Sequence, residues 1–269
     1  TGDGRGGGVA FSPDGRRVIV GTERHRVVVC DRDTGVAVYV ASASAGGLLW
    51  LALNRDGTRG AGYHMGGNSA LVFDARPTGG RVLPTGTDTY ALSPFANGSR
   101  VVSGGADGAA RVWDLRTGRG LVSGPRHRPA PGLRQRDEVV RAVAVAPDGG
   151  AVASAGEDRV VRVWDAATGA ERHALAGHRG WVVGVAWLPG GRLASVGGVW
   201  DEAKDENTAA EVCVWDAATG ARLLRWDAHP VRADGFAASP DGRFLATGAA
   251  DGAVRLWDAA TGALVREWK

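Results

Sequence analysis

Apolar residues occur in short runs along the whole chain, and turns rich in Gly, Pro, Asp and Asn separate them. Residues 48–53, 140–146 and 181–187 are such runs, and each is followed by a turn and another apolar run. Strands of this length with turns every roughly 8–12 residues predict an all-β fold. No segment keeps the 3.6-residue apolar period of an amphipathic helix, so we expect almost no helix.

One six-residue strand pattern recurs and ends in Trp-Asp or a substitute for it. Its copies are residues 26–31, 69–74, 109–114, 160–165, 211–216 and 253–258. The closing aspartates lie 43, 40, 51, 51 and 42 residues apart. A Pro-Asp-Gly-like turn precedes each copy and a Thr-Gly turn follows it. A period of this length indicates a repeat architecture with four strands, a to d, in each unit.

This order of landmarks resembles the WD40-repeat family over essentially the whole chain, and most closely in residues 229–268. The resemblance implies one all-β domain, residues 1–269, folded as a β-propeller of six four-stranded blades. An incomplete seven-bladed ring is the alternative. Cys30 and Phe73 replace the Trp of the first two repeats. The approximate blades are 9–41, 48–84, 90–123, 139–176, 181–226 and 231–269.

The resemblance also implies a hydrogen-bonded chain of His, Ser or Thr, Asp and Trp in each blade. Blades three and four lack the His at the expected place, and an insertion replaces the turn Asp of blade five. Such a chain satisfies buried polar groups, so we interpret it as structural and not as a hydrolase triad. From blade six back to blade three, the matching residues are His229, Thr247, Asp251 and Trp257; His178, Ser195 and Trp215; Ser154, Asp158 and Trp164; and Ser103, Asp107 and Trp113.

Two intervals exceed the repeat and place insertions between Asp114 and Asp148 and between Gly190 and Asp216. The first insertion lies in the Arg-rich loop 119–137, and the second contains the acidic loop 198–211. The first insertion connects strand d of blade three to strand a of blade four, and the second connects strands b and c of blade five. In the WD40-repeat family, d–a and b–c connections both emerge on the top face of the propeller. We therefore predict a charged partner-binding rim there; two solvated loops that screen one another are the alternative. The candidate residues are Arg126, His127, Arg128, Arg134, Arg136, Trp181, Trp200, Asp201 and Glu202.

Other chemistry has little support. Residues 2–8 are glycine-rich, but a phosphate loop needs a strand before it and a helix after it, so we expect a flexible leader. Cys30 and Cys213 lie in different repeats, which predicts two buried thiols in a reducing compartment. No metal spacing, signal peptide or transmembrane run is visible, so we expect no metal, no cofactor, no membrane and a cytoplasmic location.

The net charge is +3 and the pI is about 9.2, with an Arg-, Ala- and Gly-rich composition typical of a high-GC bacterial genome. We predict a non-enzymatic scaffold or sensor module of a larger signalling protein, which binds a protein or peptide on its top face. A propeller enzyme with a site in its channel is one alternative. Nucleic-acid binding through the loop 119–137 is another, and a steep salt dependence would be its mark.

Overall fold

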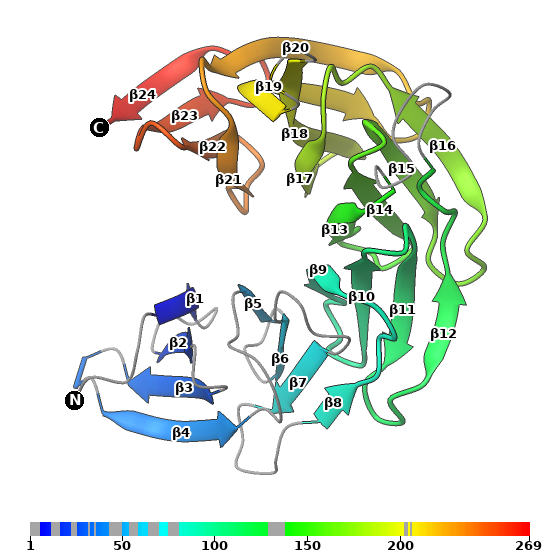
Figure 1. Ribbon diagram of the computed structural model, residues 1–269, viewed down its shortest axis with the longest axis vertical. Helices are drawn as coiled ribbons and strands as arrows, with labels where there is room; N and C mark the ends of the chain where they lie inside the picture. Colours follow the sequence, from blue (N-terminus) through cyan, green and yellow to red (C-terminus); the bar gives the residue numbers. More distant parts are fainter. Residues whose placement is uncertain are drawn as a thin grey trace. The chain divides into compact units, whose positions relative to one another are not determined.

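Six four-stranded antiparallel sheets make up the part of the chain that the computed structural model describes. In each sheet the strands lie side by side in chain order (Figure 1). The described part contains no helix, and therefore none that could cross a membrane. The prediction of an all-β fold with the four-stranded sheets of a WD40 β-propeller is confirmed. The described residues are 6–11, 17–22, 26–31, 33–34, 36–42, 50–53, 59–63, 70–74, 81–128, 138–201, 204 and 206–269.

The strands fall into two compact units, and the first comprises residues 1–123 and 147–149. It holds three sheets, whose strands are coloured from blue to green in Figure 1. The glycines at 6–8 belong to the first strand, so the expectation of a flexible leader is wrong for them. The strands are β1 (Gly6–Phe11), β2 (Arg17–Thr22), β3 (Arg26–Asp31) and β4 (Ala37–Ser42); β5 (Trp50–Leu53), β6 (Arg59–Tyr63), β7 (Ala70–Asp74) and β8 (Arg81–Leu83); and β9 (Thr89–Pro94), β10 (Arg100–Gly105), β11 (Ala110–Asp114) and β12 (Gly120–Ser123).

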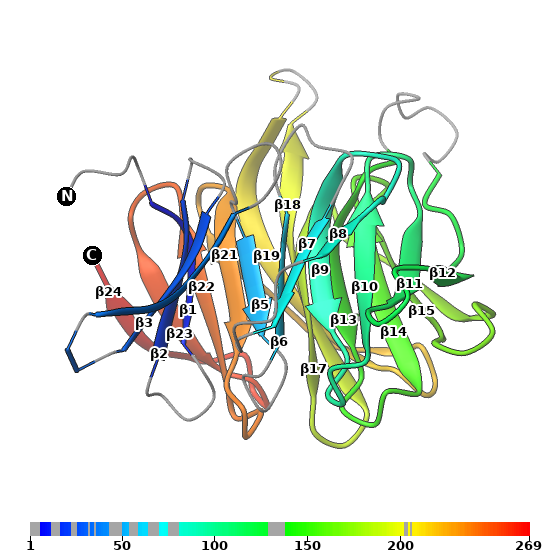
Figure 2. The same ribbon diagram turned by 90° about the horizontal axis from the view of Figure 1, so that it is seen from below.

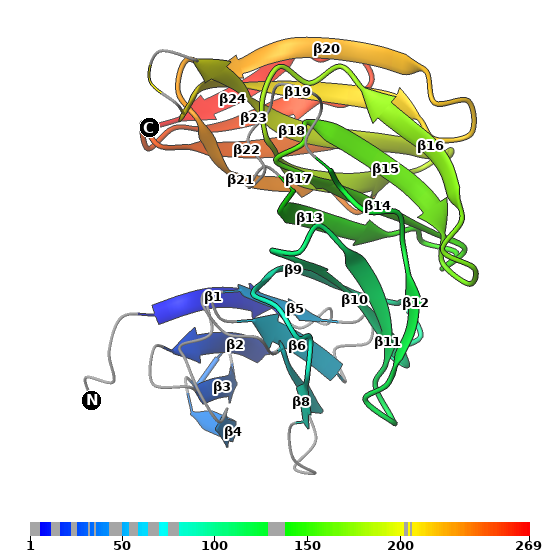
Figure 3. The same ribbon diagram turned by 45° about the vertical axis from the view of Figure 1, so that its right-hand side comes forward.

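The second unit comprises residues 124–146 and 150–269 and also holds three sheets. Its strands run from green to red in Figure 3. They are β13 (Val140–Val145), β14 (Ala151–Gly156), β15 (Val160–Asp165) and β16 (Glu171–Ala176); β17 (Val182–Leu188), β18 (Arg192–Asp201), β19 (Glu206–Asp216) and β20 (Arg222–His229); and β21 (Ala233–Ala238), β22 (Phe244–Ala249), β23 (Val254–Asp258) and β24 (Leu264–Trp268).

Burial changes from strand to strand across a sheet. All six residues of β14, an inner strand between β13 and β15, are buried. By contrast, all five residues of the outermost strand β24 are exposed. In the second unit, Trp187 of β17 donates its indole N–H to the Ala144 carbonyl of β13 at 3.1 Å, which links two sheets. The apolar core of this unit therefore lies on the inner strands and between successive sheets.

The Asp that closes strand c starts a tight turn, as its spacing to Thr-Gly predicts. Asp258 Oδ1 accepts hydrogen bonds from the backbone N–H of Thr261 and from its hydroxyl, both at 2.9 Å. Gly262 then has a φ of 73°, a conformation that glycine adopts without a steric penalty. The repeated Asp is therefore a turn residue, while the Trp before it points into the sheet.

Candidate functional site

A buried hydrogen-bonded group lies at one end of the sheet β13–β16. The imidazole of His127 has Nδ1 at 2.8 Å from Asp158 Oδ1 and Nε2 at 2.9 Å from Ser154 Oγ. The indole N–H of Trp164 donates to the same Ser154 oxygen at 3.2 Å. Because a carboxylate only accepts hydrogen bonds, we assign the proton of the neutral ring to Nδ1. The Arg162 guanidinium forms an ion pair with the other oxygen of Asp158 at 2.5 Å.

His127 was predicted to bind a partner, and the structure corrects this. Its side chain is fully buried, so it is not available at a surface. Burial lowers the pKa of His127, although the Asp158 carboxylate opposes the shift. No His was predicted for this blade, because the Arg-rich insertion lengthens the segment between His127 and β13 and puts this His farther from strand a than His178 and His229 are.

The sheet β17–β20 holds the same type of group with a different acid. His178 Nε2 lies 2.6 Å from Ser195 Oγ, and the indole N–H of Trp215 donates to that oxygen at 2.8 Å. The other ring nitrogen, Nδ1, faces Glu211 Oε1 at 3.1 Å. The turn Asp is indeed absent, but Glu211 in β19 takes its place, and sequence reasoning had assigned this residue to an acidic loop.

Two arginines neutralise Glu211. The Arg179 backbone N–H and its Nε donate to the two carboxylate oxygens at 2.8 and 2.6 Å, and Arg225 forms an ion pair with Oε2 at 2.9 Å. Burial alone would raise the pKa of the Glu211 carboxyl, but the hydrogen bonds from His178 and Arg179 outweigh it and lower the pKa to about 2. Glu211 is therefore an ionised, buried acid at the centre of a network.

Three residues in and beside the Glu211 network are of the types that bind metal ions. His178, Glu211 and Cys213 place potential ligand atoms within 4.8 Å of one another, and all three residues are buried. However, both ring nitrogens of His178 are hydrogen-bonded, and Arg179 and Arg225 already compensate the Glu211 charge. Burial and the nearby Glu211 raise the pKa of the Cys213 thiol to about 12, which disfavours a thiolate ligand. We therefore interpret the cluster as an ion-paired network.

In the sheet β21–β24 the group is incomplete. His229 Nε2 lies 2.8 Å from Thr247 Oγ1, and the indole N–H of Trp257 donates to the same hydroxyl at 2.9 Å. Asp251, which was predicted to complete the group, is exposed and accepts from the backbone N–H of Ala253 at 3.0 Å. His229 Nδ1 is buried and has no hydrogen-bond partner among the described residues. The blade that matched the family best in sequence thus lacks one contact.

The sheet β9–β12 keeps only the Ser–Trp pair. Trp113 donates its indole N–H to Ser103 Oγ at 2.8 Å. Asp107 forms an ion pair with Arg111 at 2.5 Å. Thr85 stands four residues before β9, the spacing that His178 and His229 have from β17 and β21, and it is buried. This agrees with the sequence, which shows no His for this blade.

We expect Ser195→Ala to destabilise the protein more than Ser103→Ala. Ser195 Oγ is hydrogen-bonded to both His178 and Trp215, whereas Ser103 Oγ accepts a hydrogen bond from Trp113. Leaving buried donors and acceptors unsatisfied should cost about 2 kcal/mol for Ser195→Ala and about 1 kcal/mol for Ser103→Ala. Urea unfolding of both variants and the wild type measures the difference. Equal losses would contradict the larger role of the His-containing group.

The second insertion forms a projecting hairpin. The pairing of β17 with β18 ends at Gly197, and that of β20 with β19 ends at Ala210. Beyond these points β18 and β19 pair with each other as far as Asp201 opposite Glu206 (Figure 2). We call residues 199–209 the hairpin. It was predicted as part of an acidic loop, and Trp200 and Asp201 lie on its first strand.

The hairpin rises from the end of the sheets that carries the histidines. His127 precedes β13 and contacts Asp158 in the β14–β15 turn, so the d–a and b–c connections meet at one end. His178, before β17, likewise meets Glu211 at the start of the β19–β20 pairing. This is the relation between these connections that the family resemblance implies.

The remaining predicted partner-binding residues differ in exposure and in how much of them the structure describes. Arg126 and Arg128 are exposed and precede β13, whereas Arg134, Arg136 and Glu202 lie outside the described residues. Trp181 is half-buried, with the Arg141 guanidinium 5.8 Å from its ring centre. Trp200 is described by its backbone, and Asp201 forms an ion pair with Lys204 at 3.9 Å.

The cysteines match the prediction in part. Cys213 is buried, as expected, but Cys30 is only half-buried. Neither forms a disulfide.

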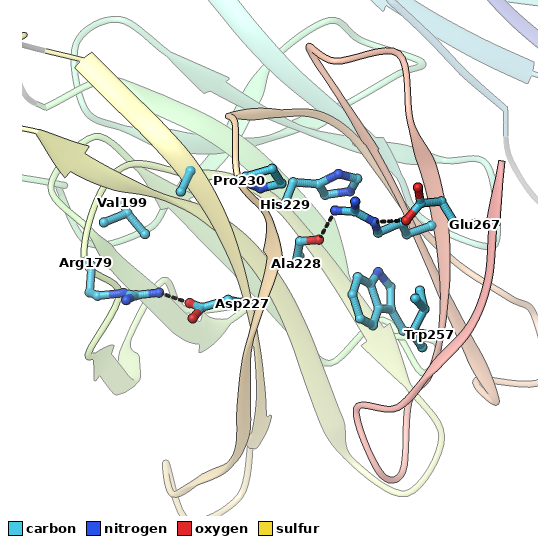
Figure 4. A pocket seen from close by; sticks show the side chains of 11 residues that line it. Arg179, Val199, Asp227, Ala228, His229, Pro230, Trp257 and Glu267 are labelled. Atoms are coloured by element: carbon cyan, nitrogen blue, oxygen red, sulfur yellow. Dashed lines mark hydrogen bonds and ion pairs between the residues drawn. The ribbon is translucent and has the colours of Figure 1, made fainter. Parts of the chain in front are cut away.

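A groove with a volume of about 530 Å³ lies at the base of the hairpin. Val199 and Ala209 of the hairpin line one side, and Arg255, Leu264 and Glu267 of β23–β24 line the other. Figure 4 shows Arg179 and Asp227 at one end and His229 beside Pro230. The groove was not predicted, because no sequence signal places β24 next to the hairpin base.

Three segments of the chain match the family described as WD domain, G-beta repeat: residues 81–114, 133–165 and 221–258. Protein HIR1 of Yarrowia lipolytica is 26% identical over an alignment of 203 residues. The match covers 63% of this chain and 18% of that protein. DENN domain and WD repeat-containing protein SCD1 of Arabidopsis thaliana is 27% identical over 161 residues, 59% of this chain and 12% of that protein.

WD repeat and SOCS box-containing protein 1 of Xenopus tropicalis is 34% identical over 109 residues, 38% of this chain and 24% of that protein. The chain thus spans between 12% and 24% of the length of these three relatives. Together with the fold, the matches support a WD40 repeat protein. All three relatives are eukaryotic, so the bacterial, high-GC origin stays a prediction.

Proposed function

We propose that the chain is a protein-interaction scaffold or sensor module, and that it binds a protein segment at the hairpin and the groove beside it. The WD-repeat matches support a scaffold role in general. The names of two relatives combine WD repeats with a DENN domain or a SOCS box, which favours a role within a larger regulatory protein.

The projecting hairpin is the observation that carries this proposal. Among the described residues, 199–200 and 206–209 have strand partners only within the hairpin, so the outer edges of the hairpin extend beyond the rest of the sheet. Such edges are templates for an added strand from a partner. A two-stranded hairpin is only marginally stable by itself, so a hairpin that extends beyond its sheet fits a binding element better than a structural one.

An enzyme is the weaker alternative. Ser154 and Ser195 resemble triad nucleophiles because each lies next to a His that contacts an acid. Both side chains are fully buried and also accept a Trp N–H, so a substrate cannot reach their oxygens. Nucleic-acid binding would use the exposed Arg126 and Arg128 and would weaken steeply as salt rises.

We expect a photo-cross-linking residue at Lys204 to trap a protein partner in cells that express the protein. The side chain of Lys204 is 61% exposed near the hairpin tip, which makes it a suitable reporter. The same residue placed at Leu121 of β12, which is 50% exposed, is the matched control. Adducts specific to position 204 are expected, and mass spectrometry identifies them.

A shortened hairpin provides the second arm of this test. Replacing residues 199–209 with an Asn-Gly turn keeps the pairs of β17 with β18 and of β19 with β20. The trapped partner should then bind at least about tenfold more weakly, equivalent to about 1.4 kcal/mol, with the melting temperature little changed. Identical adducts at positions 204 and 121, or unchanged binding by the shortened chain, would refute the proposal.

A further inference from the structure

One wall of the groove contains a histidine with an unused donor. His229 is 2% exposed and lines the groove, and within the part of the chain that the structure describes its Nδ1 has no hydrogen-bond partner. Trp257 donates to Thr247 Oγ1, and, as in the His127 and His178 groups, we assign the hydroxyl hydrogen to the bond with His229 Nε2. The neutral ring then carries its proton on Nδ1. The missing partner must therefore be an acceptor.

The other two His-containing sheets show which acceptor fits this position. Asp158 meets His127 Nδ1 at 2.8 Å, and Glu211 meets His178 Nδ1 at 3.1 Å. In both cases an arginine neutralises the acid, so the position is built for a carboxylate with a cation beside it. Arg255 is the corresponding cation at His229, because it pairs with Thr247 in the β22–β23 register as Arg162 pairs with Ser154.

Asp251 does not fill the position because Arg255 points elsewhere. In the sheet β13–β16, Arg162 holds Asp158 close to the His. Arg255 instead binds Glu267 Oε2 at 2.8 Å and the Ala228 carbonyl at 2.6 Å (Figure 4). Asp251 consequently remains in its turn, bonded to the backbone of Ala253. The buried Nδ1 of His229 and the guanidinium of Arg255 thus lie in the wall of the groove.

We propose that this groove binds the carboxylate of an acidic side chain from a protein partner, with His229 Nδ1–H as its donor and Arg255 as its charge partner. The inference rests on the proposed function, since it names the chemistry that the scaffold would recognise. Leu264 and Pro230 supply apolar contacts for the carbon chain of a Glu or Asp side chain at the same site.

Nuclear magnetic resonance of the ¹⁵N-labelled full chain tests the site directly. The probes are acetyl-Gly-Glu-Gly-amide and the matched acetyl-Gly-Gln-Gly-amide. The Glu peptide should shift the His229 side-chain resonances in a saturable way and leave those of His127 and His178 unchanged, because their Nδ1 atoms already have acceptors. No shift with either peptide, or equal shifts with both, would overturn the inference.

Two variants separate this site from the alternatives. Arg255→Gln should weaken binding of the Glu peptide at least about tenfold, whereas Arg232→Gln, at an exposed arginine outside the groove, should leave it unchanged. If Arg255→Gln does not fold, the wild-type titration decides. A shift of the ligand-free His229 signals in Asp251→Asn would show that Asp251 occupies the position, and would refute the site. The hairpin experiments test the proposed function independently, since they use neither peptide.

Discussion

Glu211→Ala should lower the free energy of unfolding by about 4 kcal/mol, because it removes one partner from a buried, charged network. The substitution leaves His178 without its acceptor and removes the shared counter-charge of Arg179 and Arg225. Chemical denaturation at neutral pH measures the loss. Asp227→Asn is the matched control: Asp227 also pairs with Arg179, but its side chain is 79% exposed, so we expect a change below about 1 kcal/mol.

The pH dependence of stability tests whether Glu211 is ionised in the folded protein. The pKa of Glu211 is about 2 in the folded protein, below its ordinary value of 4.5. Its contribution is therefore fully present above pH 4.5 and is lost as the pH falls towards 2. Between these values the wild type should lose more stability than Glu211→Gln, which has no group to protonate. Parallel pH profiles of the two proteins would contradict an ionised Glu211.

His127→Ala should destabilise the protein by about 3 kcal/mol, through a cavity and the loss of the hydrogen bonds to Asp158 and Ser154. Thermal or urea unfolding measures this effect. Arg126→Ala and Arg128→Ala flank the site and are exposed, so each should change stability by less than about 0.5 kcal/mol. A stable His127→Ala protein with weakened partner binding would restore the surface role first predicted for His127.

The fold was accessible from sequence because its signals are local and repeated. The turn made by Asp258, Thr261 and Gly262 uses hydrogen bonds within four residues, so spacing alone identifies it. The Ser–Trp pairs were also predictable: Ser103 lies opposite Arg111 in the β10–β11 register, two residues from Trp113, and the repeat preserves this offset. These contacts depend on strand register, which the repeat preserves.

The acids of the network were less accessible, because they depend on where side chains point. Glu211 holds the first position of the repeated strand, where the other copies carry no acid, so the repeat pattern does not point to it as the partner of His178. Asp251 has the expected spacing but lacks the arginine contact that holds Asp158 in place. The groove likewise arises from the packing of β24 near the hairpin base, a long-range relation that no local pattern encodes.

Placing the network's acid on a strand uncouples hairpin length from sheet integrity. In β13–β16 the same Asp158 shapes the turn and anchors His127, so lengthening that turn would disrupt both. In β17–β20 the anchor is Glu211, within the part of β19 that also pairs with β20, and the chain beyond Gly197 and Ala210 carries none of it. Residues 199–209 are therefore a site at which foreign recognition sequences of different lengths can be grafted without loss of the supporting sheet.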